Sequence, residues 1–248
     1  MGEAAKDNSL GKYMDGSKLS AERGELHQKI LEDLFKDAYP VTSGNPTFYM
    51  MGGGPASGKS SVIKAGNITL PKNIIAVDSD AIKARLPDYQ SMVAAKNPMA
   101  ASFVHEESSA LAKRAMEIAQ KNGYNSMLDG TGDGSIPSLM KKINQARTGG
   151  SQVVGYYVTC PTEEAVRRSA ARAAKTGRVV MNDVITSTHK KVSQIMPECA
   201  QYFDRVELFD TMDGVRLVAT GGSGKGLVAK PGMERLLREF IAKGGENG

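Results

Sequence analysis

A glycine-rich run between an apolar strand pattern and a helical pattern constrains this chain more than any other feature. Residues 53–60 read Gly-Gly-Pro-Ala-Ser-Gly-Lys-Ser and satisfy the pattern GxxxxGK(S/T) in full. Glycines let the backbone approach phosphate oxygens closely, and the amide groups that open the following helix favour an anion. The run therefore predicts a phosphate-binding loop for ATP. The predicted ATP-binding residues are Gly53, Gly54, Pro55, Ala56, Ser57, Gly58, Lys59, Ser60 and Ser61.

Two side chains of this loop have predicted chemical roles. The ammonium group of Lys59 is expected to neutralise the β- and γ-phosphates, and the hydroxyl of Ser60 to coordinate the Mg²⁺ that bridges them. A second glycine-rich run at residues 221–226 lacks the first glycine and the final Ser or Thr of the pattern. We predict that this second run is a flexible loop.

Strand and helix patterns alternate along the chain, and this alternation predicts the fold class. We expect an α/β fold of the P-loop NTPase or kinase type, with a doubly wound, mostly parallel sheet and helices on both of its faces. An Asp-Gly pair predicts a hairpin after the last strand pattern. The predicted strands are 47–51, 73–77, 125–128, 152–159 and 205–209, with 215–219 as the hairpin partner. The predicted helices are 20–39, 104–122, 135–148, 162–174, 182–195 and 232–243.

Composition along the chain predicts its domain organisation. Residues 1–19 are polar and rich in Gly, Ser, Lys and Asp, which predicts a flexible leader. We expect residues 20–248 to form one domain that contains the phosphate-binding loop. Its core is predicted at about 46–220 and its C-terminal helix at about 232–243.

Composition also excludes several classes of function. The 2 cysteines have no metal-ligand spacing, so we expect a reducing, cytoplasmic location. No window reaches the roughly eighteen apolar residues of a membrane-spanning helix, which disfavours a membrane protein. The net charge of +5 comes from scattered residues and suits an anionic ligand, whereas a nucleic-acid partner is unlikely without a basic patch.

The residues after the second strand pattern indicate what the triphosphate is used for. No NKxD motif for guanine recognition is present, and the strand ends in Asp78-Ser79-Asp80. Ligands of doubly wound sheets bind at the carboxyl ends of the strands, where the carboxylate of Asp80 can accept the proton of an attacking hydroxyl. For Asp78, capping of the next helix is an equally good interpretation.

Three motifs in one order resemble the zeta-toxin family of P-loop kinases. Besides the phosphate-binding loop, residues 78–89 resemble the family segment D-x-D-x-x-(K/R)-x-x-x-P-x-(Y/F), and residues 129–132 read Asp-Gly-Thr-Gly, like the family's acidic residue and GTG. The resemblance covers about residues 48–209 and implies that Asp80 is the general base. It also implies a small acceptor, with UDP-N-acetylglucosamine the best guess, and an antitoxin partner. The implied substrate-binding residues are Asp78, Lys83, Glu107, Asp129 and Thr131.

The resemblance further implies a single P-loop kinase domain over residues 20–248 with a helical lid at about 162–182, whose arginines also match the family. Such arginines stabilise the charge of the transferring phosphoryl group, and Arg168, Arg172 and Arg178 are the implied clamp. For Arg167 an exposed, solvated position is the better interpretation. For His189 we favour a structural, hydrogen-bonded role over a catalytic one.

Two positions leave alternatives open. Glu107, together with Glu106, can instead be a solvated residue of the first helical turn. The family typically carries Arg directly after GTG, whereas this chain has Asp133. Either a diphosphate is held differently here, or the acceptor is not UDP-N-acetylglucosamine.

Two other functions are compatible with the same motifs. One is a polynucleotide or nucleoside kinase with the same core. The other is a largely non-catalytic nucleotide-binding module of a phage or toxin assembly, in which the helices at 20–39 and 232–243 dock to partners.

Overall fold

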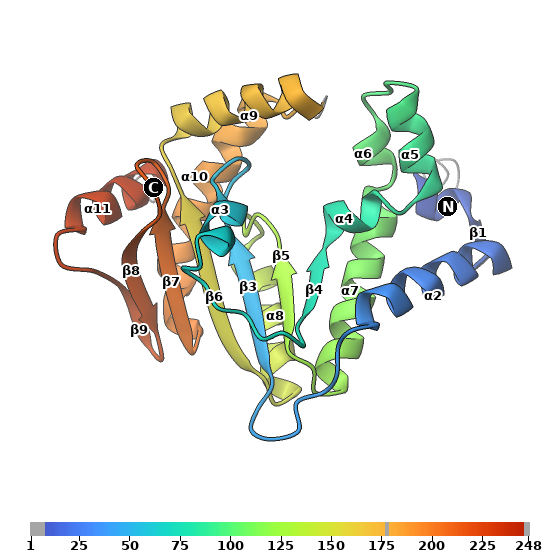
Figure 1. Ribbon diagram of the computed structural model, residues 1–248, viewed down its shortest axis with the longest axis horizontal. Coiled ribbons are helices and arrows are strands. Elements are labelled where there is room, and N and C mark those ends of the chain that lie inside the picture. The colour runs from blue at the N-terminus through green and yellow to red at the C-terminus, as the bar shows by residue number, and fades with distance from the viewer. Residues whose placement is uncertain (1–7, 177–178, 246–248) are drawn as a thin grey trace. The chain divides into compact units, whose positions relative to one another are not determined.

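The computed structural model describes residues 8–176 and 179–245. The chain has an α/β fold with a mostly parallel sheet of seven strands, which confirms the predicted class (Figure 1). It divides into two compact units, one formed by Met1–Ser43 and Lys72–Leu128, the other by Gly44–Pro71 and Asp129–Gly248. We call them unit 1 and unit 2. That the two fold as a single domain stays a prediction.

Unit 2 contains most of the sheet, in the order β3-β6-β7-β8-β9. β3 pairs in parallel with β6, with Thr47 opposite Gln152, and β6 pairs in parallel with β7. After their first residues, β3 and β6 are buried throughout, as expected for strands covered on both faces. The strands are β3 (Thr47–Gly52), β6 (Gln152–Thr159), β7 (Arg205–Asp210), β8 (Arg216–Gly222) and β9 (Lys225–Ala229).

The end of the sheet corrects one prediction and confirms another. β7 and β8 form the predicted antiparallel hairpin, with a register shift between Leu208 and Phe209. The run at residues 221–226, predicted as a flexible loop, instead ends β8, turns and begins β9. Its glycines permit the turn, since both Gly222 and Gly224 have positive φ.

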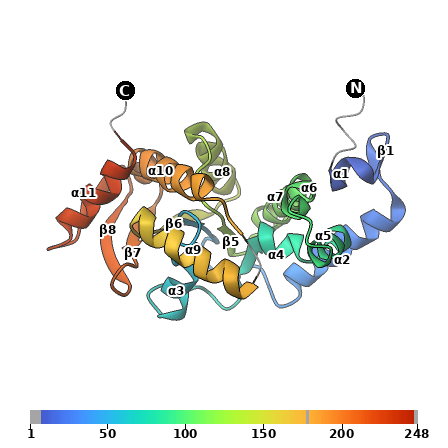
Figure 2. The same ribbon diagram turned by 90° about the horizontal axis from the view of Figure 1, so that it is seen from above.

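Helices cover both faces of the unit 2 sheet. Figure 2 shows α8 and α10 on one face and α3 on the other. α8 illustrates why the sequence folds this way, because Ser135 caps its first turn and Leu139, Ile143 and Ala146 form its buried stripe. The helices are α3 (Lys59–Lys64), α8 (Ile136–Thr148), α9 (Thr162–Thr176), α10 (Asn182–Cys199) and α11 (Glu234–Lys243), with the 3-10 helix η2 (Ala200–Tyr202).

Unit 1 consists mainly of helices around β4 and the first three residues of β5. α2 begins after the cap residue Ser20 and buries His27, Ile30 and Leu31, in agreement with the predicted helix. The elements are α1 (Ser9–Lys12), β1 (Met14–Asp15), β2 (Lys18–Leu19), α2 (Ala21–Phe35), β4 (Ile75–Asp78), α4 (Ser79–Lys83), α5 (Pro87–Ala94), α6 (Ala100–Phe103), α7 (His105–Lys121) and β5 (Ser126–Asp129). No helix in the described ranges is long and apolar enough to cross a bilayer.

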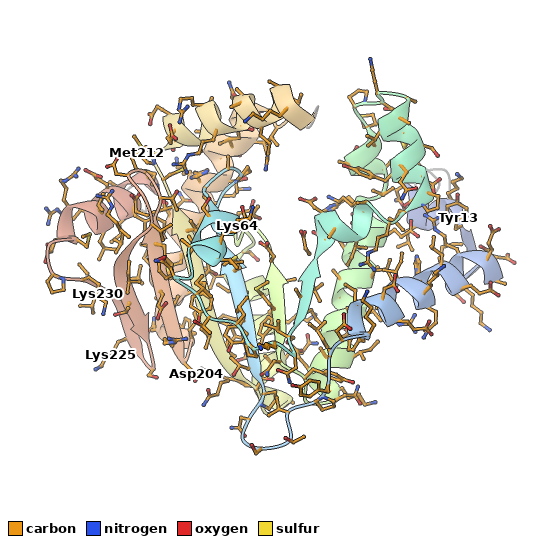
Figure 3. The ribbon with its side chains drawn as sticks, in the orientation of Figure 1. Tyr13, Lys64, Asp204, Met212, Lys225 and Lys230 are labelled. Atoms are coloured by element: carbon orange, nitrogen blue, oxygen red, sulfur yellow. The ribbon has the colours of Figure 1, made fainter. Side chains whose placement is uncertain are left out.

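The predicted flexible leader needs correction from residue 8 onward. Residues 8–19 form α1 and the β1–β2 hairpin. Lys12 Nζ lies 2.8 Å from the Asp88 carboxylate. The hydroxyl of Tyr13, which Figure 3 labels, donates to Asp88 at 3.0 Å. The polar composition predicted disorder here, but Lys12 and Tyr13 bind the carboxylate of Asp88 in α5. Residues 1–7 of the predicted leader lie outside the described residues.

Candidate functional site

The glycine-rich loop between β3 and α3 has a backbone that only glycine adopts readily at two positions. Gly53 has a φ of 141° and Gly58 a φ of 93°. A Cβ on Gly53 would collide with the carbonyl of Val158, and one on Gly58 would lie 2.9 Å from Thr211 Oγ1. The loop begins with a hydrogen bond from Gly53 N to Thr131 O at 2.7 Å. Its path is therefore set by its neighbours as well as by its own glycines.

His189 of α10 supports the loop from behind. Its Nε2 lies 3.0 Å from Pro55 O, and a Cβ on Gly54 would collide with its ring. Burial lowers the pKa of His189, which favours a neutral imidazole that donates Nε2–H to the carbonyl. The preferred interpretation of this histidine as a structural, hydrogen-bonded residue is confirmed.

The ammonium, amide and hydroxyl groups of the loop fit a nucleoside triphosphate with Mg²⁺. Lys59 Nζ donates to Gly53 O at 3.1 Å, so the ammonium group reaches back across the loop. Ser60 and Ser61 are exposed in the first turn of α3. An ammonium group, loop amides and an exposed hydroxyl are the groups that bind phosphate and a phosphate-bound Mg²⁺. Lys59 and Ser60 would hold ATP·Mg²⁺, and the bound nucleotide would supply the phosphoryl group.

The arginines of α9 differ in their hydrogen-bond partners and in their burial. Arg168 donates to Glu164 Oε1 at 2.6 Å, to Thr211 Oγ1 at 2.8 Å and to Thr211 O at 2.6 Å. Arg167 pairs with Glu164 and is exposed, which confirms its solvated position. Hydrogen bonds from these two arginines lower the pKa of Glu164 to about 2. Arg172 is partly buried on the same helix. Arg178 lies outside the described residues.

Thr211 is a part of the site that sequence analysis missed. Its Oγ1 donates to Ser57 O at 2.7 Å, while the same residue accepts from Arg168. It therefore joins the phosphate-binding loop to α9. No motif contains this threonine, which follows β7 by one residue. Its position at the carboxyl end of a strand beside β6 was the available signal.

A cavity of about 410 Å³ lies at the carboxyl ends of β6 and β7. Within it, Lys243 Nζ donates to Cys160 O at 2.9 Å, and burial lowers the pKa of this ammonium group. Met212, labelled in Figure 3, lines the cavity from the turn after β7. Sequence analysis missed the cavity because its walls come from three distant segments. The lining residues are Thr159, Cys160, Pro161, Thr162, Glu163, Asp210, Met212, Asp213, Arg216, Arg235, Leu236, Glu239, Phe240 and Lys243.

The loop after β5 lies directly against the glycine-rich loop. Besides the bond between Thr131 O and Gly53 N, Gly130 N donates to Met51 O at 3.0 Å. The hydroxyl of Thr131 donates to Asp133, and Thr188 Oγ1 donates to the other carboxylate oxygen of Asp133 at 3.4 Å. Of the predicted acceptor residues, Thr131 therefore lies beside the phosphate-binding loop. Asp129 is partly buried at the end of β5.

Three predicted acceptor-side residues lie together in unit 1, on α4 and at its start. Asp78 is the cap residue, and its Oδ1 accepts from Asp80 N at 2.8 Å, which confirms the capping interpretation. Lys83 Nζ lies 3.2 Å from Asp80 Oδ1. The Asp80 side chain is 43% exposed, so solvent or a ligand can approach its carboxylate.

Glu107 differs from both interpretations of the sequence. Its side chain is fully buried, with Arg23 Nε and His27 Nε2 each 2.6 Å from Oε1. Burial alone would raise the pKa of Glu107, but hydrogen bonds from His27 and Arg23 lower it to about 2. Arg23 Nη2 donates to the other oxygen, Oε2, at 2.8 Å, so both carboxylate oxygens of Glu107 accept hydrogen bonds inside unit 1. Glu106 is exposed, as expected for a solvated residue of the first turn.

Comparisons with known proteins give one family. A family model described as Zeta toxin matches residues 32–223. Toxin zeta of Streptococcus agalactiae is 29% identical over 105 residues, which are 42% of this chain and 36% of that protein. Toxin zeta of Streptococcus pyogenes is 29% identical over 102 residues, 41% of this chain and 35% of that protein. The matched stretch thus spans about a third of the length of these curated relatives.

Solved structures share the fold. A structure from the PezAT chromosomal toxin-antitoxin system of Streptococcus pneumoniae has a TM-score of 0.66 at 16% identity, covering 81% of each chain. The structure of AvrRxo1-ORF1:-ORF2 with ATP has a TM-score of 0.72 at 18% identity, covering 98% of this chain and 84% of the other. At these identities the likeness concerns the fold alone.

Proposed function

Because this chain belongs to the zeta toxin family, we propose that it is a kinase that transfers the γ-phosphoryl group of ATP to a hydroxyl of a small acceptor. The observation that carries the proposal is the complete phosphate-binding loop, with Lys59 Nζ folded back over it and Ser60 exposed beside it. The related structure with ATP supports the choice of nucleotide. The cavity beside Thr211 is large enough for the nucleobase.

The proposed chemistry assigns a role to each charged residue of the motifs. Asp80 accepts the proton of the acceptor hydroxyl while that oxygen bonds to the γ-phosphorus and the bond to the β-phosphate oxygen breaks, which releases ADP. Lys83, 3.2 Å from Asp80 Oδ1, orients the carboxylate. Lys59 and the arginines of α9 stabilise the charge on the transferred group. Arg168 donates through all three of its nitrogen atoms to Glu164 and Thr211, so we assign it a positioning role. Arg172 and Arg178 are the other arginines that we propose for the clamp.

The family resemblance is also the basis on which we propose an acceptor substrate and a protein partner. UDP-N-acetylglucosamine, which the family resemblance implies, is the first acceptor to test, with nucleosides as the second group. Asp129 and Thr131 are the proposed acceptor contacts. Glu107 is not among the proposed acceptor contacts, because its buried carboxylate is bound by Arg23 and His27. A structural relative comes from a toxin-antitoxin system, so we also propose an antitoxin as protein partner.

Substitutions of Lys59 and Asp80 test the proposal. Lys59→Ala should weaken ATP binding and abolish transfer, whereas Asp80→Asn should keep ATP binding and lower transfer by about a thousandfold. Lys64→Ala is the matched control, because Lys64 is an exposed lysine on the same helix (Figure 3). Calorimetry with ATP and mass spectrometry of the acceptor give the two readouts. Full transfer by Asp80→Asn would remove Asp80 as the base, and unchanged ATP affinity in Lys59→Ala would refute the nucleotide site.

A further inference from the structure

The carboxylate of Asp133 is held from two sides by neutral donors. The Thr131 hydroxyl donates to one oxygen, and Thr188 Oγ1 donates to the other at 3.4 Å. In the part of the chain that the structure describes, no Lys, Arg or His forms an ion pair with Asp133. The loop after β5 therefore carries a fixed negative charge that these two hydroxyls orient without neutralising.

Backbone contacts fix this charge beside the phosphate-binding loop. Thr131, two residues before Asp133, accepts from Gly53 N at 2.7 Å. Thr188, which donates to Asp133, directly precedes His189, which bonds to Pro55 O at 3.0 Å. All of these residues belong to unit 2. Two independent connections thus place the carboxylate next to the loop that we assign to the triphosphate.

A fixed carboxylate discriminates between ligands by charge. Two like charges a few ångströms apart repel each other, and water at a protein surface weakens this repulsion without abolishing it. A phosphate group of the acceptor at this loop would meet that repulsion in addition to the charge of ATP. A hydroxyl or a cationic group would instead find an acceptor with lone pairs still available.

We propose that Asp133 is a specificity-determining residue that selects acceptors presenting a hydroxyl or a positive charge to the loop after β5, and that disfavours acceptors presenting a phosphate there. The inference rests on the proposed kinase function and narrows its substrate class. It points away from a sugar nucleotide whose diphosphate is held by this loop. Thr131 and Thr188 are the positioning residues that keep the carboxylate in place.

Binding of a matched pair of probes tests the inference. UDP and uridine differ by the diphosphate, and each is titrated by calorimetry with and without a saturating non-hydrolysable ATP analogue and Mg²⁺. Asp133→Asn removes the charge and keeps the side-chain size, so it should raise the affinity for UDP relative to uridine by about tenfold. Thr188→Val keeps the charge but removes one of the two positioning hydrogen bonds, so it should change this ratio in the same direction and by less than Asp133→Asn.

Asp183→Asn is the matched control, because it makes the same change at an exposed residue in the first turn of α10. It should change the ratio less than about twofold. A purely structural role of Asp133 would alter both affinities together and leave the ratio constant, which would overturn the inference. Absence of UDP binding to wild type and to Asp133→Asn alike would also overturn it. Failure of the kinase function would appear separately, as an absence of phosphoryl transfer to any acceptor.

Discussion

Replacement of Glu107 by glutamine should strongly destabilise the protein. Gln has nearly the same shape but no charge, so Arg23 would keep Asp88 Oδ2, at 2.9 Å, as its charged partner. The single carbonyl oxygen of the amide could replace only one of the two carboxylate oxygens that accept from Arg23. The amide group would also turn N–H donors toward donors of Arg23 or His27. The interior of unit 1 would then hold an incompletely compensated guanidinium group, which is costly in a buried setting.

The magnitude follows from the pKa of Glu107. Its pKa falls from 4.5 to about 2 in the folded protein, which corresponds to about 3 kcal/mol of unfolding free energy. Removal of one partner from a buried ion pair typically costs a similar 3–5 kcal/mol or so. With a urea m-value of about 3 kcal/mol/M, the midpoint should fall by about 1 M.

Urea unfolding followed by circular dichroism measures this loss at about pH 7, with Glu106→Gln as the matched control. Glu106 is exposed on the same helix turn, and its replacement should change the unfolding free energy by less than about 0.5 kcal/mol. The pH dependence gives a second readout. Because the folded pKa lies below the unfolded one, the contribution of Glu107 is complete above about pH 5 and is lost as the pH falls toward 2.

The difference between wild type and Glu107→Gln should therefore shrink across this acidic range. The reasoning is refuted if Glu107→Gln costs less than about 1 kcal/mol, or no more than Glu106→Gln. A difference in unfolding free energy that stays constant from about pH 5 to 2 would also refute it, because the loss would then not depend on the charge.

Two further predictions concern the support of the phosphate-binding loop. Gly54→Ala should weaken ATP binding by at least about tenfold in calorimetry, because its Cβ would collide with His189. The control Gly226→Ala, which has open space around it, should bind ATP normally. Equal ATP affinities of the two variants would contradict this prediction. Burial lowers the pKa of His189, so the unfolded chain binds a proton more readily and wild type should lose stability as the pH falls from about 7 to 5. His189→Gln should show a smaller slope in urea unfolding, and an unchanged slope would count against a neutral buried imidazole.

Local signals made the central part of the fold predictable. In the run at residues 53–60, all residues of the phosphate-binding motif are consecutive in the sequence. β6 has the predicted bounds because its apolar residues are also contiguous. The capping role of Asp78 was likewise visible, since a cap depends on residues next to it. These confirmed predictions depended on residues that are neighbours in sequence.

Contacts between distant segments could not be predicted from one sequence. The partners of Glu107 come from α2, about eighty residues earlier, so neither a ligand contact nor a solvated residue was the right interpretation. Thr211 supports the phosphate-binding loop across more than a hundred and fifty residues. The prediction for residues 8–19 was wrong because composition does not show that Lys12 and Tyr13 bind Asp88, about seventy-five residues later in α5.

The pairing of β3 with β6 has a consequence for synthesis of the chain. Thr47 lies opposite Gln152, so the strand that precedes the phosphate-binding loop leaves the ribosome about a hundred residues before its neighbour. At translation rates of about 5–20 residues per second, the loop waits several seconds for the strand beside it. His189 and Thr211, which support the loop, follow later still. A ribosome-bound chain that ends before these residues would lack the contacts that support the loop, so the nucleotide site forms only after Thr211 has been synthesised.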